Sequence, residues 1–177
     1  MRRLGLVAIM ALAATASMAK DKPVTGTAVA GGRTAMATLR TSAGVEVGRA
    51  KITEVVRGLR VVVDVKGMPA GTHGAHLHTV GRCDAPDFAS AGGHWNPMNM
   101  KHGSMNPQGP HAGDMPNLVV GADGRGTLGI NLAGANFDSL MDADGATVVL
   151  HAAADDMMTD PSGNSGGRIA CGVLTLG

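Results

Sequence analysis

The amino-acid sequence predicts an all-β fold, a sandwich or barrel of short antiparallel strands. Alternation is the first observation: between Gly58 and Lys66, leucine or valine stands at every second position, and three of the positions between are charged. Composition is the second, because the chain has 27 glycines, turn signals such as residues 122–124, and no helical periodicity of useful length. Further runs with strand character are Thr34–Arg40, Val45–Val56, Leu118–Gly121, Gly126–Leu132, Ala146–Ala152 and Arg168–Leu176.

The length of 177 residues fits a single domain, and the composition argues against a nucleic-acid partner. The formal net charge is +1, so no strong positive field would attract a polyanion. Aromatic residues make up 2 % of the chain, too few for the stacking surfaces that bind single-stranded nucleic acids. Because 44 % of the residues are hydrophobic, the chain is expected to fold rather than to remain disordered.

The first 19 residues have the features of a secretory signal peptide. Arg2 and Arg3 precede an apolar stretch from Leu4 to Ala14 that is too short to span a bilayer, and small residues follow at Ser17 and Ala19. We therefore expect a single domain over residues 20–177, located in the periplasm or secreted after cleavage. No cysteine follows the apolar stretch, so we expect no lipid anchor. Removal of the two arginines would change the formal net charge from +1 to −1.

The chain has two cysteines, Cys83 and Cys171. An even number of cysteines in an exported protein indicates a disulfide, and two free buried thiols are the alternative. In the chain-entropy model, a bridge between positions this far apart stabilises the fold by ~4 kcal/mol. Neither cysteine has a second cysteine nearby, so a cysteine-based zinc site is disfavoured.

Two segments are too long for ordinary connections between strands and are expected to be functional. We call residues 82–117 the long loop, which is rich in proline, glycine and methionine, and residues 155–167 the short loop. Three histidines and Asp114 lie in the long loop. Three imidazoles with one carboxylate form a donor set that suits tetrahedral zinc. The candidate zinc ligands here are His94, His102, His111 and Asp114.

A second set of histidines lies near the ends of strand-like runs. His76 and His78 follow one such run, and residues two apart on a strand share a face, so both rings can reach one metal ion. His151 ends another apolar run and can supply a third ligand. A nitrogen-only set suits a copper ion that changes oxidation state. An isolated His-x-His is more often a surface or core feature, but all seven histidines fall within residues 73–151.

Six motifs follow one another in the chain: Gly74–His78, Gly92–Pro97, Lys101–Gly103, Gly109–Asp114, His151–Asp156 and Gly167–Val173. Together they resemble the copper/zinc superoxide dismutases, and specifically the exported bacterial members. The resemblance extends over residues 24–177 and implies an eight-stranded Greek-key sandwich or barrel with long metal-binding and electrostatic loops. It implies an oxidoreductase that disproportionates superoxide to oxygen and hydrogen peroxide, with one copper and one zinc ion per subunit. Monomer and homodimer both remain open.

The resemblance also implies a role for each site residue. Asp155 corresponds to an aspartate that orients a copper ligand and a zinc ligand, and Arg168 to an arginine that meets the substrate anion. Cys83 and Cys171 correspond to a disulfide, and His73 to a histidine that binds no metal. The implied copper ligands are His76, His78, His94 and His151, and the implied zinc ligands are His94, His102, His111 and Asp114, so that His94 bridges the two ions.

The sequence allows more than one interpretation of the function and of several residues. A metal carrier of the same fold is the main rival function, but it would be expected to lack His94, Arg168 or one ligand set. Residues 156–167 contain no lysine or arginine, so attraction of an anion would fall to Arg82 and Lys101 unless both are ordinary surface charges. Trp95 either packs in the core or lies at a subunit contact. Met98, Met100, Met105 and Met115 either fill space or hand over Cu(I).

Overall fold

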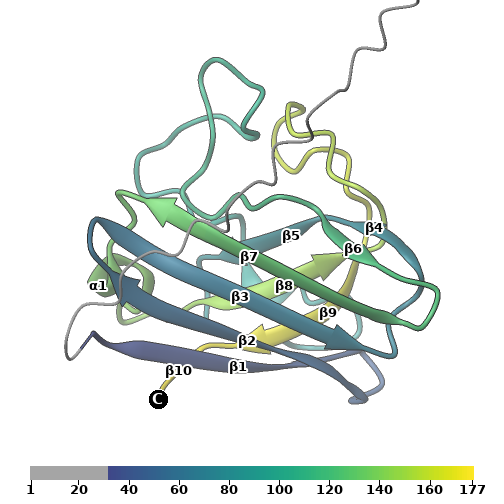
Figure 1. The fold of residues 1–177 in the computed structure, drawn as a ribbon. Helices are drawn as coiled ribbons and strands as arrows, with labels where there is room; N and C mark the ends of the chain where they lie inside the picture. Colours follow the sequence, from purple (N-terminus) through teal and green to yellow (C-terminus); the bar gives the residue numbers. More distant parts are fainter. Residues whose placement is uncertain (1–31) are drawn as a thin grey trace, which may run out of the picture.

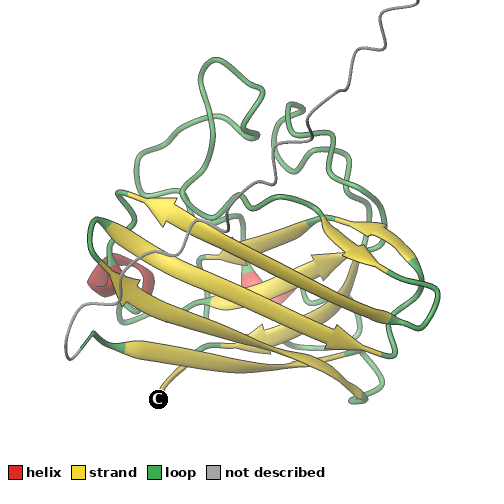
Figure 2. Cartoon of the chain, in the orientation of Figure 1, coloured by secondary structure: helices red, strands yellow, loops and turns green. Residues whose placement is uncertain are grey.

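The computed structural model describes residues 32–177, and the expected signal peptide, residues 1–19, lies outside the described residues. The described part is built almost entirely of strands and loops (Figures 1 and 2). No helix in residues 32–177 is long and apolar enough to cross a membrane. The elements are β1 (Thr34–Arg40), β2 (Glu46–Val55), β3 (Gly58–Lys66), β4 (Gly71–His73), β5 (Ala75–His78), a 3-10 helix (Ala89–Ala91), β6 (Leu118–Val120), β7 (Arg125–Ala133), α1 (Phe137–Leu140), β8 (Thr147–His151), β9 (Arg168–Val173) and β10 (Thr175–Leu176).

The strands form a curled antiparallel sheet in the order β5-β8-β9-β1-β2-β3-β7, with β10 paired to β1. β1, β2 and β3 are consecutive neighbours, whereas β7 beside β3 and β9 beside β1 are the crossovers of a Greek-key arrangement. β4 comes directly before β5 in the chain and pairs with β6. β6 in turn contacts β7, which lies at the opposite edge of the large sheet from β5. The predicted all-β Greek-key fold is therefore confirmed.

Each strand predicted by alternation is present to within one residue at its ends, except the last. The run Arg168–Leu176 is divided into β9 and β10. His76 and His78 follow the short strand β4 and lie within β5, so the strand geometry used to predict their shared face is present. Histidine is a weak strand signal, and Gly74 separates the short strands β4 and β5. A Cβ at Gly74 would lie 2.8 Å from the Cβ of Ser165, so the short loop passes close to the chain there.

The core lies between the two sides of the curled sheet and consists mainly of leucine and valine. In β3, Leu59, Val61 and Val63 are fully buried, and their neighbours in sequence point outward, as the alternation predicts. A second, smaller cluster contains Phe88, Val149 and Cys171 and lies at the start of the long loop. The long loop and the short loop both extend from the same end of the sheet (Figure 1). The fold thus places the two predicted functional loops side by side.

Candidate metal centre

β5 and β8 carry the histidines at the floor of the site. The register pairs His76 with Val149 and His78 with Thr147, which brings His151, the last residue of β8, beside β5. The long loop is attached to the other edge of β5, where the backbone N–H of Trp95 donates to Leu77 O at 2.8 Å and His94 forms a bridge with His78. Period-two geometry and strand pairing therefore bring the histidines together.

Donor atoms of His76, His78, His94 and His151 all lie within 4.8 Å of one another, and we call this group the four-histidine cluster. His78 Nδ1 donates to Gly92 O at 3.0 Å and His151 Nδ1 to Gly166 O at 3.1 Å, because a carbonyl oxygen can only accept. Their Nε2 atoms therefore carry lone pairs. Four buried ring nitrogens have no hydrogen-bond partner within residues 32–177, namely His76 Nδ1, His78 Nε2, His94 Nε2 and His151 Nε2.

Four converging lone pairs without a proton donor are costly unless a cation binds them. Protonation does not solve this problem, since burial lowers the pKa of His76 and of His151 to about 4 and that of His78 to about 2. The rings of His76, His78 and His151 are therefore neutral at pH 7, which is the form that binds a metal ion. The four-histidine cluster thus fits a metal that accepts nitrogen ligands.

The second group surrounds Asp114, and we call it the three-histidine–aspartate cluster. Asp114 Oδ1 lies 2.9 Å from His94 Nδ1, 3.1 Å from His102 Nδ1 and 3.2 Å from His111 Nδ1. His94 Nδ1 and His111 Nδ1 are 3.4 Å apart. A tetrahedral zinc ion with bonds of about 2.0–2.1 Å holds its ligand atoms about 3.3–3.4 Å apart. These spacings fit such an ion closely.

His102 supplies a further argument for a cation here. Its Nε2 donates to Asp155 Oδ1 at 3.0 Å, so in the neutral ring Nδ1 carries a lone pair that faces the Asp114 carboxylate. A cation between them removes this repulsion. Although burial alone would raise it, hydrogen bonds from His94 and from the Gly103 N–H lower the pKa of Asp114 to about 2, which keeps the carboxylate ionised.

His76 also approaches the second group, since donor atoms of His76, His94, His102 and Asp114 lie within 4.8 Å of one another. His111 is nevertheless the better fourth ligand. The Nε2 of His76 is bonded to Asp155 at 2.7 Å, and its Nδ1 is one of the four unpartnered nitrogens of the first cluster. His111 Nδ1, by contrast, lies directly beside both Asp114 and His94.

Asp155 connects the two clusters. Its two carboxylate oxygens bind different rings, Oδ2 the Nε2 of His76 and Oδ1 the Nε2 of His102. Burial raises the pKa of this carboxyl, but the bonds from His76 and His102 prevail and hold it at about 2. The ionised carboxylate fixes which nitrogen of each ring is protonated and which is free to bind a metal ion.

Arg168 and the disulfide lie on the other side of the four-histidine cluster. Arg168 starts β9 opposite His151, and its guanidinium donates to Phe88 O at 2.6 Å and to Gly92 O at 2.7 Å. Both carbonyls belong to the segment that the Cys83–Cys171 disulfide ties to β9, and neither cysteine is free. The guanidinium, which is charged at any ordinary pH, is thus held in place by backbone carbonyls, and its electrostatic partner is the Asp87 carboxylate.

The remaining residues that the sequence singled out either pack in the core or form local ion pairs and hydrogen bonds. Trp95 is buried in the core, and its Nε1 donates to Ser139 O at 3.2 Å. Lys101 is paired with Asp160 and Arg82 with Asp84, so neither presents an unopposed charge. Asp156 accepts bonds from the backbone N–H groups of Met158 and Thr159 and caps the short loop.

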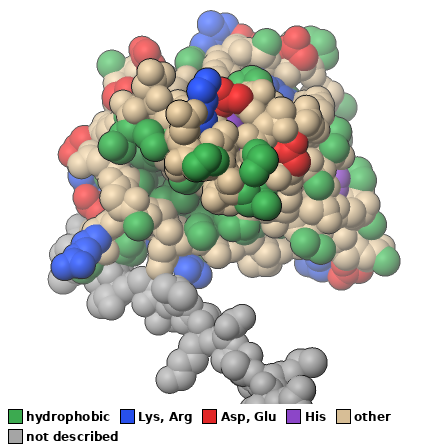
Figure 3. All heavy atoms as spheres, turned by 90° about the horizontal axis from the view of Figure 1, so that it is seen from above, with side chains coloured by type: hydrophobic (Ala, Val, Ile, Leu, Met, Phe, Trp, Pro, Cys, Tyr) green, Lys and Arg blue, Asp and Glu red, His purple; other side chains and the backbone are tan. Residues whose placement is uncertain are grey.

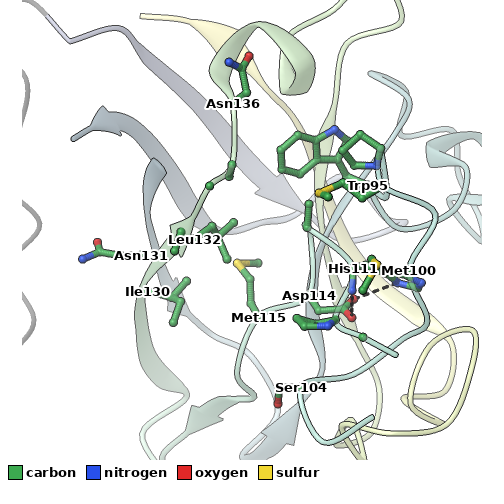
Figure 4. A pocket seen from close by; sticks show the side chains of 18 of the residues that line it. Trp95, Met100, Ser104, His111, Asp114, Met115, Ile130, Asn131, Leu132 and Asn136 are labelled. Carbon is green, nitrogen blue, oxygen red and sulfur yellow. Dashed lines mark hydrogen bonds and ion pairs between the residues drawn. The ribbon is translucent and has the colours of Figure 1, made fainter. Parts of the chain in front are cut away.

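A groove of about 780 Å³ separates part of the long loop from β7. Met100, Met115, His111 and Asp114 lie on the loop side in Figure 4, and Ile130 and Leu132 lie opposite them. Met115 is 2 % exposed, so it fills space, whereas Met98 is 76 % exposed. Very little of the histidine side chains is visible from the loop side in Figure 3, which agrees with their burial.

Two glycines and Asp160 belong to the site, but the sequence alone did not show their roles. Gly92 and Gly163 have φ of +73° and +64°, and a Cβ at Gly163 would lie 1.7 Å from Asp155 Oδ1. The motif that contains His94 did include Gly92, but nothing in its spacing showed that its carbonyl oxygen serves Arg168. Asp160, in the short loop, accepts a hydrogen bond from the backbone N–H of His102 in the long loop.

Comparison with known proteins agrees with this geometry. Residues 46–174 match the family model described as copper/zinc superoxide dismutase. The chain belongs to this family. Family membership makes the protein an enzyme, a superoxide dismutase and thus an oxidoreductase, as the residue motifs predict, and it disfavours the carrier.

Individual relatives cover most of the chain. It is 40 % identical over 139 residues to superoxide dismutase [Cu-Zn] 1 of Aquifex aeolicus, which covers 74 % of this chain and 81 % of that protein. The superoxide dismutase [Cu-Zn] of Caulobacter vibrioides is 40 % identical over 147 residues, or 79 % and 84 % of the two chains. The crystal structure of a SOD-like protein from Bacillus subtilis superposes with a TM-score of 0.75 at 41 % identity, covering 79 % of this chain and 97 % of that one.

Proposed function

We propose that the four-histidine cluster holds one copper ion and the three-histidine–aspartate cluster one zinc ion per subunit, and that the enzyme uses them to disproportionate superoxide. The supporting observation is that four unpartnered ring nitrogens converge beside a tetrahedral donor set and that the two groups share His94. Bound copper supplies the one-electron redox change that the reaction requires, whereas zinc has no redox chemistry.

The residues around the clusters bind, orient and transfer protons. Arg168 has a full positive charge fixed by two carbonyls, and its remaining N–H groups can bind a small anion. Asp155 holds the rings of His76 and His102 in the tautomer that each metal needs. Two cations are required to keep both nitrogens of His94 deprotonated. When no cation holds its Nε2, His94 can take up a proton there and donate it to the reduced substrate.

Location and assembly are part of the same proposal. The basic, apolar and small-residue pattern of residues 1–19 supports export to the periplasm or beyond, and the Cys83–Cys171 disulfide agrees with an oxidising compartment. Superoxide is the only partner that the proposal requires. The lack of a cysteine directly after the apolar stretch supports a protein that carries no lipid anchor.

The decisive experiment measures superoxide removal together with metal content. Activity should disappear with a copper chelator and return when copper is added. His78→Gln should lower copper retention and leave zinc, and His111→Gln should do the reverse. His94→Ala should weaken zinc retention and alter the copper spectrum. His73→Gln is a matched control for zinc retention only, because His73 is buried and bonds to the carbonyl oxygens of Pro69 and of the candidate copper ligand His151, but to no residue of the zinc group. Unchanged spectra at full loading in His94→Ala would rule out the shared ligand.

A further inference from the structure

The long loop and the short loop are joined by a continuous set of contacts beside the three-histidine–aspartate cluster. The Met105 N–H donates to Met157 O at 2.9 Å, and the Asn106 side chain donates to Met158 O at 3.2 Å. These bonds bring the short loop over residues 101–106 of the long loop. The long loop and the short loop therefore form one structural unit beside the three-histidine–aspartate cluster.

Asp160 makes the central contact of this set. Its Oδ1 accepts from the backbone N–H of His102 at 2.8 Å, and its Oδ2 accepts from Lys101 Nζ at 2.8 Å. The same Oδ1 lies 4.0 Å from the Nε2 of His111. One carboxylate of the short loop thus faces two candidate zinc ligands and the residue that precedes one of them.

His102 is consequently held from both ends by the short loop. Asp155 binds its ring at Nε2, and Asp160 binds its backbone N–H. His102 is fully buried, so water does not reach its backbone N–H or its ring, although the Asp160 carboxylate is itself partly exposed. With both ends fixed, the ring can turn very little, and Nδ1 remains directed at Asp114 Oδ1, 3.1 Å away.

The loops also approach too closely for side chains at two glycines. A Cβ at Gly103 would lie 2.1 Å from Met157 O, and one at Gly163 would lie 2.8 Å from His102 Nε2. Both glycines have positive φ, at +96° and +64°. The backbone is therefore shaped for close contact between the loops, and the Asp160 bonds are part of that contact.

We propose that Asp160 is a positioning residue for the zinc site, which holds the backbone of His102 in place and couples the short loop to zinc retention. The inference rests on the proposed zinc assignment of His102, His111 and Asp114. Lys101 then serves to pair with Asp160 rather than to attract superoxide. The bond to the His102 N–H is the essential one, since ion pairs as exposed as Lys101–Asp160 contribute little.

Three variants separate these contributions. Asp160→Ala removes both bonds, Asp160→Asn keeps an oxygen that can accept from the His102 N–H, and Lys101→Met removes only the ion pair. Asp123→Ala is the matched control, because Asp123 also accepts one backbone N–H, that of Arg125, but in a turn between strands. Full-length zinc-loaded protein is used, and zinc release to a chromogenic chelator is timed. Co(II) substituted for zinc reports the ligand geometry through its visible absorption.

We expect Asp160→Ala to release zinc 10–100-fold faster, as is typical when a partner of a metal ligand is removed, and to change the Co(II) absorption. Asp160→Asn and Lys101→Met should stay within about threefold of the wild type, as should Asp123→Ala. If Asp160→Ala releases zinc at the wild-type rate and its Co(II) spectrum is unchanged, the inference about Asp160 is wrong, but the zinc assignment is not affected. If the wild-type protein takes up neither zinc nor Co(II), or if His111→Gln releases zinc no faster, the zinc assignment fails and the inference with it.

Discussion

His78 and Arg168 share one acceptor, the carbonyl oxygen of Gly92, which lies 3.0 Å from His78 Nδ1 and 2.7 Å from Arg168 Nη2. A candidate copper ligand and the candidate anion-binding residue are therefore oriented by the same peptide group. Movement of that peptide would disturb the metal and the substrate site together. Gly92 has a φ of +73°, and a Cβ there would lie 2.9 Å from Thr79 Oγ1 and 3.0 Å from Val80 Cγ2.

Gly92→Ala should therefore lower activity per bound copper several-fold, because the new Cβ displaces the shared carbonyl. Gly44→Ala is the matched control: Gly44 also has positive φ, at +79°, but nothing lies within 4 Å of a Cβ there. The control should lose stability from backbone strain, about 1–2 kcal/mol, without a change in activity per copper. Superoxide removal normalised to copper content checks both. Equal activity of the two variants would contradict the role of Gly92.

The disulfide should stabilise the same segment. Cys83 and Cys171 are separated by 88 residues. The chain-entropy model therefore gives a stabilisation of roughly 4–5 kcal/mol. Because Phe88 O and Gly92 O hold Arg168, the paired Cys83→Ser and Cys171→Ser substitutions should lower both the melting temperature and the activity per copper. A fall in melting temperature with unchanged activity would mean that the loop holds Arg168 without the bridge.

Strand-level features of the site were predictable, and contacts between loops were not. The spacing of His76 and His78 implied a shared face because side chains alternate on a strand, and both rings do point into one cluster. The two hydrogen bonds of Asp155, one to the ring of His76 and one to the ring of His102, were predicted only from the family resemblance. The contact of Asp160 with the His102 N–H had no signal at all, since it depends on a loop path with left-handed residues such as Met157 and Asn164.

Acid should destabilise the metal-free protein well before the carboxylates titrate. Burial lowers the pKa of His76, His78 and His151 in the folded state, to about 4, 2 and 4, whereas an unfolded chain has histidine pKa values of about 6.5. The unfolded state therefore binds more protons below about pH 6.5, so the free energy of unfolding falls as pH decreases from there toward 4.

Urea unfolding of metal-free protein between pH 7.5 and 4.5 checks this expectation. His78→Gln removes one of the buried rings whose pKa is lowered and should give a shallower dependence on pH. The contribution of Asp155, whose pKa lies near 2, should be lost only at lower pH, as the pH falls through about 3.8 and below. Stability that is constant from pH 7 to 4.5 would contradict the neutral state of the buried rings.

Attraction of superoxide should depend on Arg168 rather than on Arg82 or Lys101. Cleavage after residue 19 would leave a formal net charge of −1, so the protein as a whole does not attract an anion. Arg82 and Lys101 face Asp84 and Asp160, and each pair acts at a distance as a small dipole with no net charge. Arg168 donates hydrogen bonds only to carbonyl oxygens within the described residues, and although the Asp87 carboxylate acts on it electrostatically, no carboxylate forms an ion pair with it there. A single local cation can still guide a small anion to the site.

The second-order rate should therefore fall with salt, as the Debye length shortens from ~30 Å at 0.01 M to ~8 Å at 0.15 M. Arg168→Gln should lower the low-salt rate and flatten that dependence while metal content is unchanged. The double substitution of Arg82→Gln with Asp84→Asn removes a whole pair without altering net charge, and its curve should coincide with that of the wild type. If the double variant instead loses the salt dependence and Arg168→Gln keeps it, the surface pair rather than Arg168 provides the attraction.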